Sequence, residues 1–127
     1  MPFDWQAFVA LARDLQQQAS SAVHREAFLR SAVSRAYFGA FGHAINYAKQ
    51  FLQFQSRDLV EDHGRLREHL KRRRRKGDSD RLEQLRQWRN EADYSNNLPW
   101  RDPPATVATA IKWADAVFAS LVPPKAS

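Results

Sequence analysis

Cysteine is absent from this 127-residue chain, and glycine occurs only four times. Without cysteine, the chain cannot form disulfides, thiolate metal sites or a cysteine nucleophile. No stretch alternates strictly between apolar and polar residues, as a half-buried strand does, and apolar residues instead recur at helical spacing almost throughout. We therefore predict an all-α protein. Its 43% hydrophobic and 27% charged content excludes a disordered, collagen-like or coiled-coil chain.

Long apolar runs are also missing. The longest weakly polar stretch, Ala36–Ala48, contains His43 and Asn46 and is well short of the roughly 20 apolar residues that cross a bilayer. The N-terminal residues show no cationic segment followed by an apolar one, as a secretion signal would. We expect a cytoplasmic protein with no membrane partner.

The basic residues are concentrated in one place. Lys and Arg number 20 and Asp and Glu 14, which gives a net charge of +6, and without the run KRRRRK the two signs balance at 14 each. Six neighbouring cations repel one another, so the run is either a solvated surface, a contact for an acidic protein or a nucleic-acid site. The run consists of Lys71, Arg72, Arg73, Arg74, Arg75 and Lys76.

The apolar periodicity predicts an up-down helical bundle of about five helices. We expect one domain over residues 1–122 and a frayed tail at 123–127. The longest predicted helix is apolar around much of its circumference, so it should lie at the centre of the bundle. The expected helices run from residue 4 to the polar stretch at 16–21, from 21 or 23 to about 54, from 62 through the basic run, from 80 to 94–97, and from 103 to 121.

Polar and conformationally special residues predict the helix ends. The first helix should begin at Asp4, flanked by Phe3 and Phe8 at the spacing of a hydrophobic staple. The other ends that we expect are Ser20 or Ser21 at the start of the second helix, Gly77 and Asp78 at the end of the third, Asp80 with Glu83 at the start of the fourth, and Asp102 with Pro103 at the start of the fifth.

One arginine interrupts an apolar stripe in the fourth predicted helix. Leu82, Leu85 and Ala92 share the stripe, and Arg89 lies between them. A buried guanidinium needs a partner because its desolvation costs several kcal/mol. Asp93, one turn further on, is one candidate partner. A phosphate, held in a cleft or at a subunit interface, is the other, since the guanidinium fork matches phosphate oxygens.

Two sequence blocks, one early and one late, point to a known family. The string SRAYFGAFGHA spans residues 34–44, and RNEADY spans residues 89–94. Together with DHGRLREHLK at 62–71, they resemble the HEPN domain family, the helical domains of prokaryotic toxins and nucleotidyltransferase partners. The resemblance covers roughly residues 20 to 120 and is to a branch with SRAYYAAFHAA-like and RN-x-ADY-like blocks.

The resemblance implies a dimeric helical bundle. In active members the late helix carries an arginine, a polar residue and then a histidine, and two such motifs meet across the dimer and cleave RNA without metal. Arg89 and Asn90 match the first two positions, but Tyr94 stands in place of the histidine. Tyrosine has an ordinary pKa of roughly 10 and is a poor base at neutral pH. The sequence therefore favours RNA binding over cleavage, with Tyr94 as a substrate contact or a nucleotidylation target.

The remaining candidates are weaker. Arg35 of the second helix is either half of a salt bridge or a second positive group near Arg89. It lies beside the alanine row of that helix, which consists of Ala32, Ala36, Ala40, Ala44 and Ala48. No metal or cofactor is expected, because the histidines lack metal-binding spacing. These histidines are His24, His43, His63 and His69.

Three functions remain open at this point. The first is an RNA-directed HEPN protein, the toxin-like member of a toxin–antitoxin pair, in which Arg89 binds phosphate, Asn90 orients it and Tyr94 contacts the substrate or is modified; a metal-independent endoribonuclease falls within this class. The second is a non-catalytic subunit that dimerises through the Arg89 stripe and supports a nucleotidyltransferase-type antitoxin. The third is a nonspecific nucleic-acid binder that uses only Lys71–Lys76.

Overall fold

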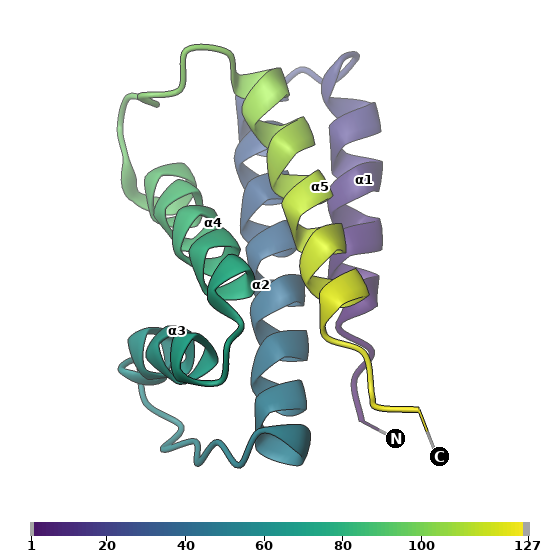
Figure 1. Cartoon of the computed structure of the whole chain (residues 1–127). Helices are drawn as coiled ribbons and strands as arrows, with labels where there is room; N and C mark the ends of the chain where they lie inside the picture. The colour runs from purple at the N-terminus through teal and green to yellow at the C-terminus, as the bar shows by residue number, and fades with distance from the viewer. Residues whose placement is uncertain (1, 126–127) are drawn as a thin grey trace.

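The computed structural model describes residues 2–125, and this part of the chain forms five helices and no strand. Figure 1 shows α1, α2 and α5 side by side, with α4 inclined against them and α3 at the lower end of α4. α2 contacts each of the other four helices, which confirms its predicted central place. The bounds are α1 Gln6–Ala19, α2 Arg25–Phe51, α3 Asp62–Arg72, α4 Lys76–Tyr94 and α5 Pro103–Ser120.

The core is built on small residues of α2. Its alanine row is fully buried, so neighbouring helices approach its backbone closely. At Gly42 the indole of Trp5 occupies the space that a Cβ atom would need, and α1 therefore packs directly on the backbone of α2. The apolar face of α5 is buried as well, and of its residues only Phe118 is partly exposed. Its buried members are Val107, Ala110, Ile111, Ala114, Val117 and Leu121.

α1 begins two residues later than predicted, but its start is organised as expected. The Asp4 carboxylate accepts a hydrogen bond from the Gln6 amide at 3.0 Å. The rings of Phe3 and Phe8 lie 4.9 Å apart between centroids, which confirms the hydrophobic staple.

The predicted start and end of the second helix were wrong. α2 begins at Arg25, because the hydroxyls of Ser20 and Ser21 donate back to the carbonyls of Gln17 and Gln18 and leave the start of α2 uncapped by serine. It ends at Phe51, and Gln53 then adopts a left-handed backbone with φ of 55°.

The boundary between α3 and α4 was also predicted wrongly. α3 stops at Arg72, five residues before Gly77, and α4 has already begun at Lys76. Arg74 takes the left-handed conformation, with φ of 63°. The Arg75 amide donates to the Leu70 carbonyl at 2.7 Å and the Arg74 amide to the Lys71 carbonyl at 3.1 Å. This is the Schellman pattern that usually places glycine where Arg74 stands.

The residues expected to separate the two helices instead lie inside α4. Asp78 is 3% exposed and accepts hydrogen bonds from Ser120 at 2.6 Å and Arg81 at 3.3 Å. Asp80 pairs with Lys76 at 2.8 Å, one turn earlier, and therefore caps nothing. Asp78 thus joins α4 to α5 from inside the helix, and Gly77 does not end a helix.

Side-chain hydrogen bonds stabilise both helix ends that flank the α4–α5 loop. Arg30 of α2 donates to the carbonyls of Ala92 and Ser95, at 3.0 and 2.6 Å, and so closes the C-terminal end of α4. Asp102 accepts from the Ala105 amide at 3.2 Å, and Pro103 is the first residue of α5, as predicted.

Beyond α5 the chain continues without helix to residue 125, and the last two residues of the predicted tail, like residue 1, lie outside the described range. Within residues 2–125, every helix is too short or too polar to cross a membrane.

Candidate anion-binding site

Arg89 of α4 points inward, as the sequence predicted. Its side chain is 14% exposed, and its Cζ lies 4.7 Å from the centre of the Phe38 ring and 5.7 Å from that of Tyr37. Nη1 donates to the Asn90 side chain at 2.7 Å, so these two predicted site residues do lie together.

The predicted partner Asp93 satisfies Arg89 only in part. The distance from Arg89 Nε to an Asp93 oxygen is 3.7 Å, which allows a loose ion pair but no hydrogen bond. That carboxylate also accepts from the Ser34 hydroxyl at 3.3 Å. Arg89 Nε is buried and has no hydrogen-bond partner within residues 2–125. An unpaired buried donor costs about 1–3 kcal/mol, so the fold holds Arg89 here at an energetic cost.

Two further arginines, which the sequence did not single out, stand beside Arg89. Arg86 of α4 also has a buried Nε without a partner in the described chain. Arg67 of α3 donates to the carbonyl of His63 at 3.2 Å. Arg67, Arg86 and Asn90 line one hollow of about 340 Å³, which Glu83 and Glu91 border. We refer to Arg67, Arg86 and Arg89 as the arginine cluster.

His63 of α3 lies against the same cluster. Its ring stacks on Phe41, with centroids 4.1 Å apart and planes 10° from parallel, and Nδ1 is hydrogen-bonded to the Tyr37 hydroxyl. Burial and the guanidiniums of the arginine cluster lower the pKa of His63 to about 4, against a smaller opposing effect of Asp62. His63 is therefore uncharged at neutral pH. The spacing of the histidines in the sequence does not single out His63, because only the packing of α3 on α2 and α4 brings it to this place.

Tyr37 contacts both His63 and Arg89. It is 1% exposed, and burial raises the pKa of its hydroxyl despite the nearby guanidiniums of Arg86, Arg67 and Arg89. The hydroxyl therefore keeps its proton. The Tyr37 ring centre lies 5.7 Å from the centre of the His63 ring and 5.7 Å from Arg89 Cζ.

Arg35 is indeed a second positive group near Arg89. Its Cζ lies 5.0 Å from the Phe8 ring centre and 5.4 Å from that of Phe38, the same ring that Arg89 contacts. Within residues 2–125 Arg35 forms no ion pair; its one hydrogen bond goes to the Ser34 hydroxyl at 3.4 Å. The salt-bridge interpretation is therefore not what the structure shows.

Tyr94 does not join this group within one chain. It is the last residue of α4, and its side chain is 76% exposed. The structure thus brings together Arg89 and Asn90 of the predicted motif and leaves Tyr94 in solvent.

The basic run bends around the α3–α4 turn and is largely engaged in internal contacts. Arg75 donates to the Ser120 carbonyl and the Tyr47 hydroxyl, at 3.3 and 3.2 Å, and Arg73 to the Leu52 carbonyl at 2.8 Å. Lys71 and Lys76 pair with Glu68 and Asp80. Arg72 and Arg74 are exposed and have no side-chain partner in the described chain.

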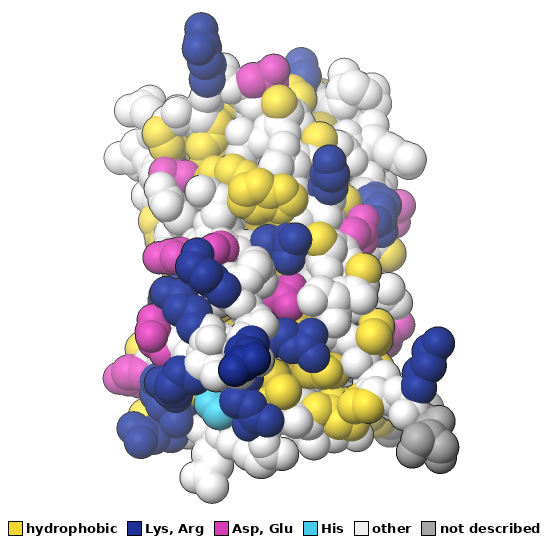
Figure 2. Space-filling view, in the orientation of Figure 1, with side chains coloured by type: hydrophobic (Ala, Val, Ile, Leu, Met, Phe, Trp, Pro, Cys, Tyr) yellow, Lys and Arg dark blue, Asp and Glu magenta, His cyan; other side chains and the backbone are white. Residues whose placement is uncertain are grey.

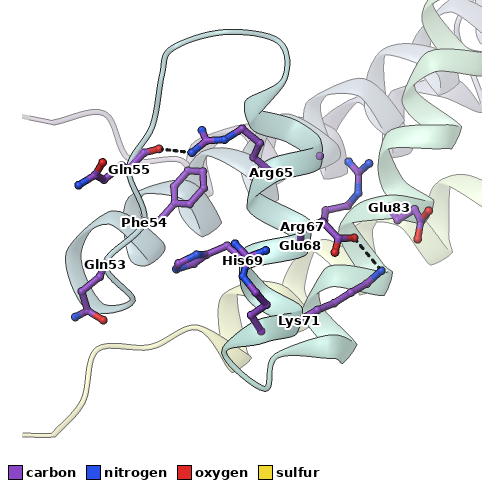
Figure 3. Close-up of a pocket in the computed structure, with 11 residues that line it drawn as sticks. Gln53, Phe54, Gln55, Arg65, Arg67, Glu68, His69, Lys71 and Glu83 are labelled. Atoms are coloured by element: carbon purple, nitrogen blue, oxygen red, sulfur yellow. Dashed lines mark hydrogen bonds and ion pairs between the residues drawn. The ribbon is translucent and has the colours of Figure 1, made fainter.

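Figure 2 shows many Lys and Arg side chains, with acidic groups among them, over the α3 and α4 end of the molecule. A larger hollow, of about 710 Å³, runs along α3 beside Gln53 and Gln55 (Figure 3). Arg65 donates across it to the Gln55 carbonyl at 3.0 Å. Arg67 and Glu83 line both this hollow and the one at Arg86, so the two hollows share one cation and one carboxylate.

Comparison of the chain with protein-family models, with curated proteins and with solved structures found no match. Residues 2–125 contain no group of three acidic, histidine or cysteine side chains arranged to hold a metal ion. The residues of the site offer guanidinium donors to an anion with several oxygens.

Proposed function

We propose that this protein is an RNA-directed, HEPN-type protein whose arginine cluster binds the phosphate backbone of single-stranded RNA. One observation carries the proposal: three arginines of α3 and α4 lie near enough to His63 to lower its pKa, and two of them have a buried Nε donor without a partner in residues 2–125.

The arrangement favours phosphate over a carboxylate partner from the chain itself. The nearest carboxylate, that of Asp93, is too far from Arg89 Nε for a hydrogen bond and is shared with Ser34. Guanidinium groups bind phosphate oxygens in pairs, and a phosphodiester offers several oxygen acceptors to the arginine cluster.

The choice of RNA and the HEPN-type assignment rest on the two sequence blocks at residues 34–44 and 89–94. Membership of a toxin–antitoxin pair has the same support. Because Tyr94 replaces the motif histidine and is exposed, binding is proposed ahead of cleavage, although an endoribonuclease activity is tested in the same experiment.

The experiment measures the affinity of labelled single-stranded RNA by fluorescence anisotropy at low salt. We expect Arg89→Ala to bind about 10- to 100-fold more weakly, as for the loss of a charged hydrogen-bond donor. Arg101→Ala, an exposed arginine in the α4–α5 loop, is the matched control and should bind like the wild type. Equal affinities of all three proteins, or no binding by the wild type, would overturn the proposal.

The same proteins are tested for RNA cleavage and for growth arrest on expression. If Arg89→Ala and the wild type behave alike in both assays, Arg89 has no catalytic role, whatever the binding result. Circular dichroism confirms that each variant is folded.

A second function is favoured by the exposure of Tyr94, which leaves its hydroxyl open to a modifying partner. In this function the chain is a non-catalytic subunit that a nucleotidyltransferase-type antitoxin binds and nucleotidylates. Co-expression with such a neighbour, followed by mass spectrometry, should show a nucleotide adduct that Tyr94→Phe abolishes.

Homodimerisation also belongs to the proposal. The α4 stripe that the sequence offered as a dimer interface is used inside the chain, where Leu82 is 1% and Leu85 0% exposed. A second copy would therefore have to bind another face, and sedimentation equilibrium of the purified protein tests whether it does.

A further inference from the structure

The large hollow beside α3, of about 710 Å³, is lined by two residues of the basic run, Lys71 and Arg72, and by none of the other four. It follows α3 from Gly64 to Arg72, which spans roughly 12 Å at the rise of an α-helix. In Figure 3 the segment with Gln53 and Gln55 lies to one side of α3. The hollow is therefore a surface feature of α3 that only part of the basic run borders.

Cations outnumber carboxylates around this hollow. The charged residues that line it are Arg65, Arg67, Lys71 and Arg72 with Glu68 and Glu83. Lys71 and Glu68 are exposed and loosely paired, with 3.4 Å between nitrogen and oxygen. Arg72 is exposed and has no side-chain partner in the described chain. Two cations of the run are therefore available to an anionic partner.

Arg67 offers a further donor at the other end of the hollow. Its Nη1 donates to the His63 carbonyl at 3.2 Å, whereas its Nη2 lies beside Gly64. A Cβ atom added to Gly64 would meet only this Nη2, at 3.8 Å, so the surface there is open. Arg65 is not available in the same way, because its two Nη atoms already bind Asp62 and the Gln55 carbonyl.

The segment beside α3 adds neutral hydrogen-bonding groups. The Gln55 side chain is exposed and forms no hydrogen bond within residues 2–125. Gln53 accepts through Oε1 from Arg73 at 2.6 Å and keeps its amide N–H groups. A side-chain amide both donates and accepts, as the main chain of a peptide does. The hollow therefore combines cations on α3 with amides that can pair with peptide groups.

The arrangement of charges favours a peptide over a nucleic acid in this hollow. A nucleic-acid strand carries a negative charge at every nucleotide, so its phosphates would pass close to Glu68 and Glu83 and be repelled. A peptide can place a carboxylate beside each cation and a neutral residue beside each glutamate.

The spacing of the cations indicates the form of the peptide. Arg67 and Lys71 are four residues apart on α3, so their side chains start about 5–6 Å from each other. In an extended peptide, residues i and i+2 point to the same side and lie about 7 Å apart. Acidic residues at alternate positions therefore match cations on successive turns of α3.

We propose that this hollow is the docking site of a partner protein that inserts an extended acidic segment with carboxylates at alternate positions. One carboxylate binds Arg67, the next binds Lys71 and Arg72, and the peptide groups between them bind the side-chain amides of Gln53 and Gln55. This inference goes beyond the proposed function and does not depend on RNA binding.

The test measures, by fluorescence anisotropy, the affinity of a labelled peptide of alternating glutamate and alanine. Lys71→Gln with Arg72→Gln should bind it about ten-fold more weakly, as for the loss of two exposed ion pairs. The matched control is Arg74→Gln with Lys76→Gln, which lie in the same run but outside the hollow. Each pair contains an exposed arginine without a side-chain partner in the described chain and a lysine that pairs within its own helix.

The control should bind within about two-fold of the wild type. Equal losses in the two double variants would mean that the peptide is attracted only by net charge, and would overturn the inference. Circular dichroism confirms that both double variants are folded.

A second peptide of the same composition tests the alternate spacing. Its glutamates stand in adjacent pairs separated by pairs of alanines, so neighbouring carboxylates point to opposite sides of an extended chain. We expect the wild type to bind it several-fold more weakly than the alternating peptide. Equal affinities would contradict binding in an extended form.

NMR locates the bound peptide. The amide resonance of Gly64, inside the hollow, should shift on addition of the alternating peptide, and that of Gly77, which lines a different hollow, should not. A shift of Gly77 without one of Gly64 overturns the inference. If oligouridylate shifts Gly64 and the peptide does not, the hollow belongs to nucleic acid and the inference fails while RNA binding stands. If the peptide shifts Gly64 and no RNA binds, the inference stands and the proposed function fails.

Discussion

Two groups of arginines in this protein differ in how the sequence and the fold present them. The basic run at Lys71–Lys76 is conspicuous in the sequence, but in the fold it bends around a turn and Arg73 and Arg75 bind backbone carbonyls. The arginine cluster is dispersed in the sequence, yet the packing of α3 on α4 gathers it around His63. The cations that are adjacent in the sequence therefore include residues that stabilise a turn. The cations that the fold brings together from α3 and α4 mark the candidate site.

The sharpest test of this contrast compares two double variants in RNA binding. Arg86→Gln with Arg89→Gln should weaken binding about 100-fold, because both unpaired donors are lost. Arg72→Gln with Arg74→Gln, which removes the same charge from the exposed part of the run, should weaken binding only a few-fold and reduce its salt dependence. Anisotropy titrations at two salt concentrations measure both effects; the reverse order would show that the run is the binding site.

The structural role of the run is tested by Arg75→Ala. Arg75 joins the α3–α4 turn to Ser120 and to the hydroxyl and ring of Tyr47, so its loss should lower the free energy of unfolding by about 2 kcal/mol. Arg72→Ala, its exposed neighbour, should change it by less than about 0.5 kcal/mol. Urea unfolding followed by circular dichroism measures both, and similar values for the two variants would contradict this role.

A smaller effect is expected at the left-handed residue of the turn. Arg74→Gly should stabilise the protein by about 1 kcal/mol, because glycine adopts a positive φ without the steric cost that arginine bears. Arg74→Ala is the control, since it removes the same charge but keeps the Cβ atom, and it should not stabilise. A gain in both variants would point to relief of charge repulsion within the run.

The smallest effect concerns pH and stability. The pKa of His63 is lowered in the folded protein, so protonation favours the unfolded chain and stability should fall as pH decreases from about 6.5 towards 4. Since the imidazole is half-exposed, solvent screening keeps the change between pH 7 and pH 6 below about 1 kcal/mol. Thermal unfolding of the wild type and His63→Gln measures it; an equal pH dependence in the two proteins would contradict the coupling to the cluster.

Local signals predicted much of the fold. The all-α class, the five helices, the central place of α2, the aromatic staple and the Asp102 cap all depend on neighbours within a few residues or on helical periodicity, and all are present. The starts of α2 and α4 were missed, because Ser20 and Ser21 turned back to α1 and because a buried contact between Asp78 and Ser120 outweighed the glycine signal.

The sequence likewise predicted some residues of the candidate site and not others. Sequence periodicity placed Arg89 on an inward face and Asn90 beside it, and both positions are as predicted. Arg67 and His63, on α3, had no spacing relation to α4 that a pattern could reveal. Tyr94, grouped with Arg89 by the resemblance, projects from the end of the helix into solvent.

The sequence by itself determined the helices and the inward arginine, because helical periodicity and hydrophobic burial act over neighbouring residues. Only the tertiary structure decided which arginines bind backbone carbonyls and which belong to the candidate site. That choice depends on which carbonyls and carboxylates the packed helices bring within hydrogen-bond distance. Carbonyls reach Arg73 and Arg75, whereas the Nε atoms of Arg86 and Arg89 have no partner in the described part of the chain.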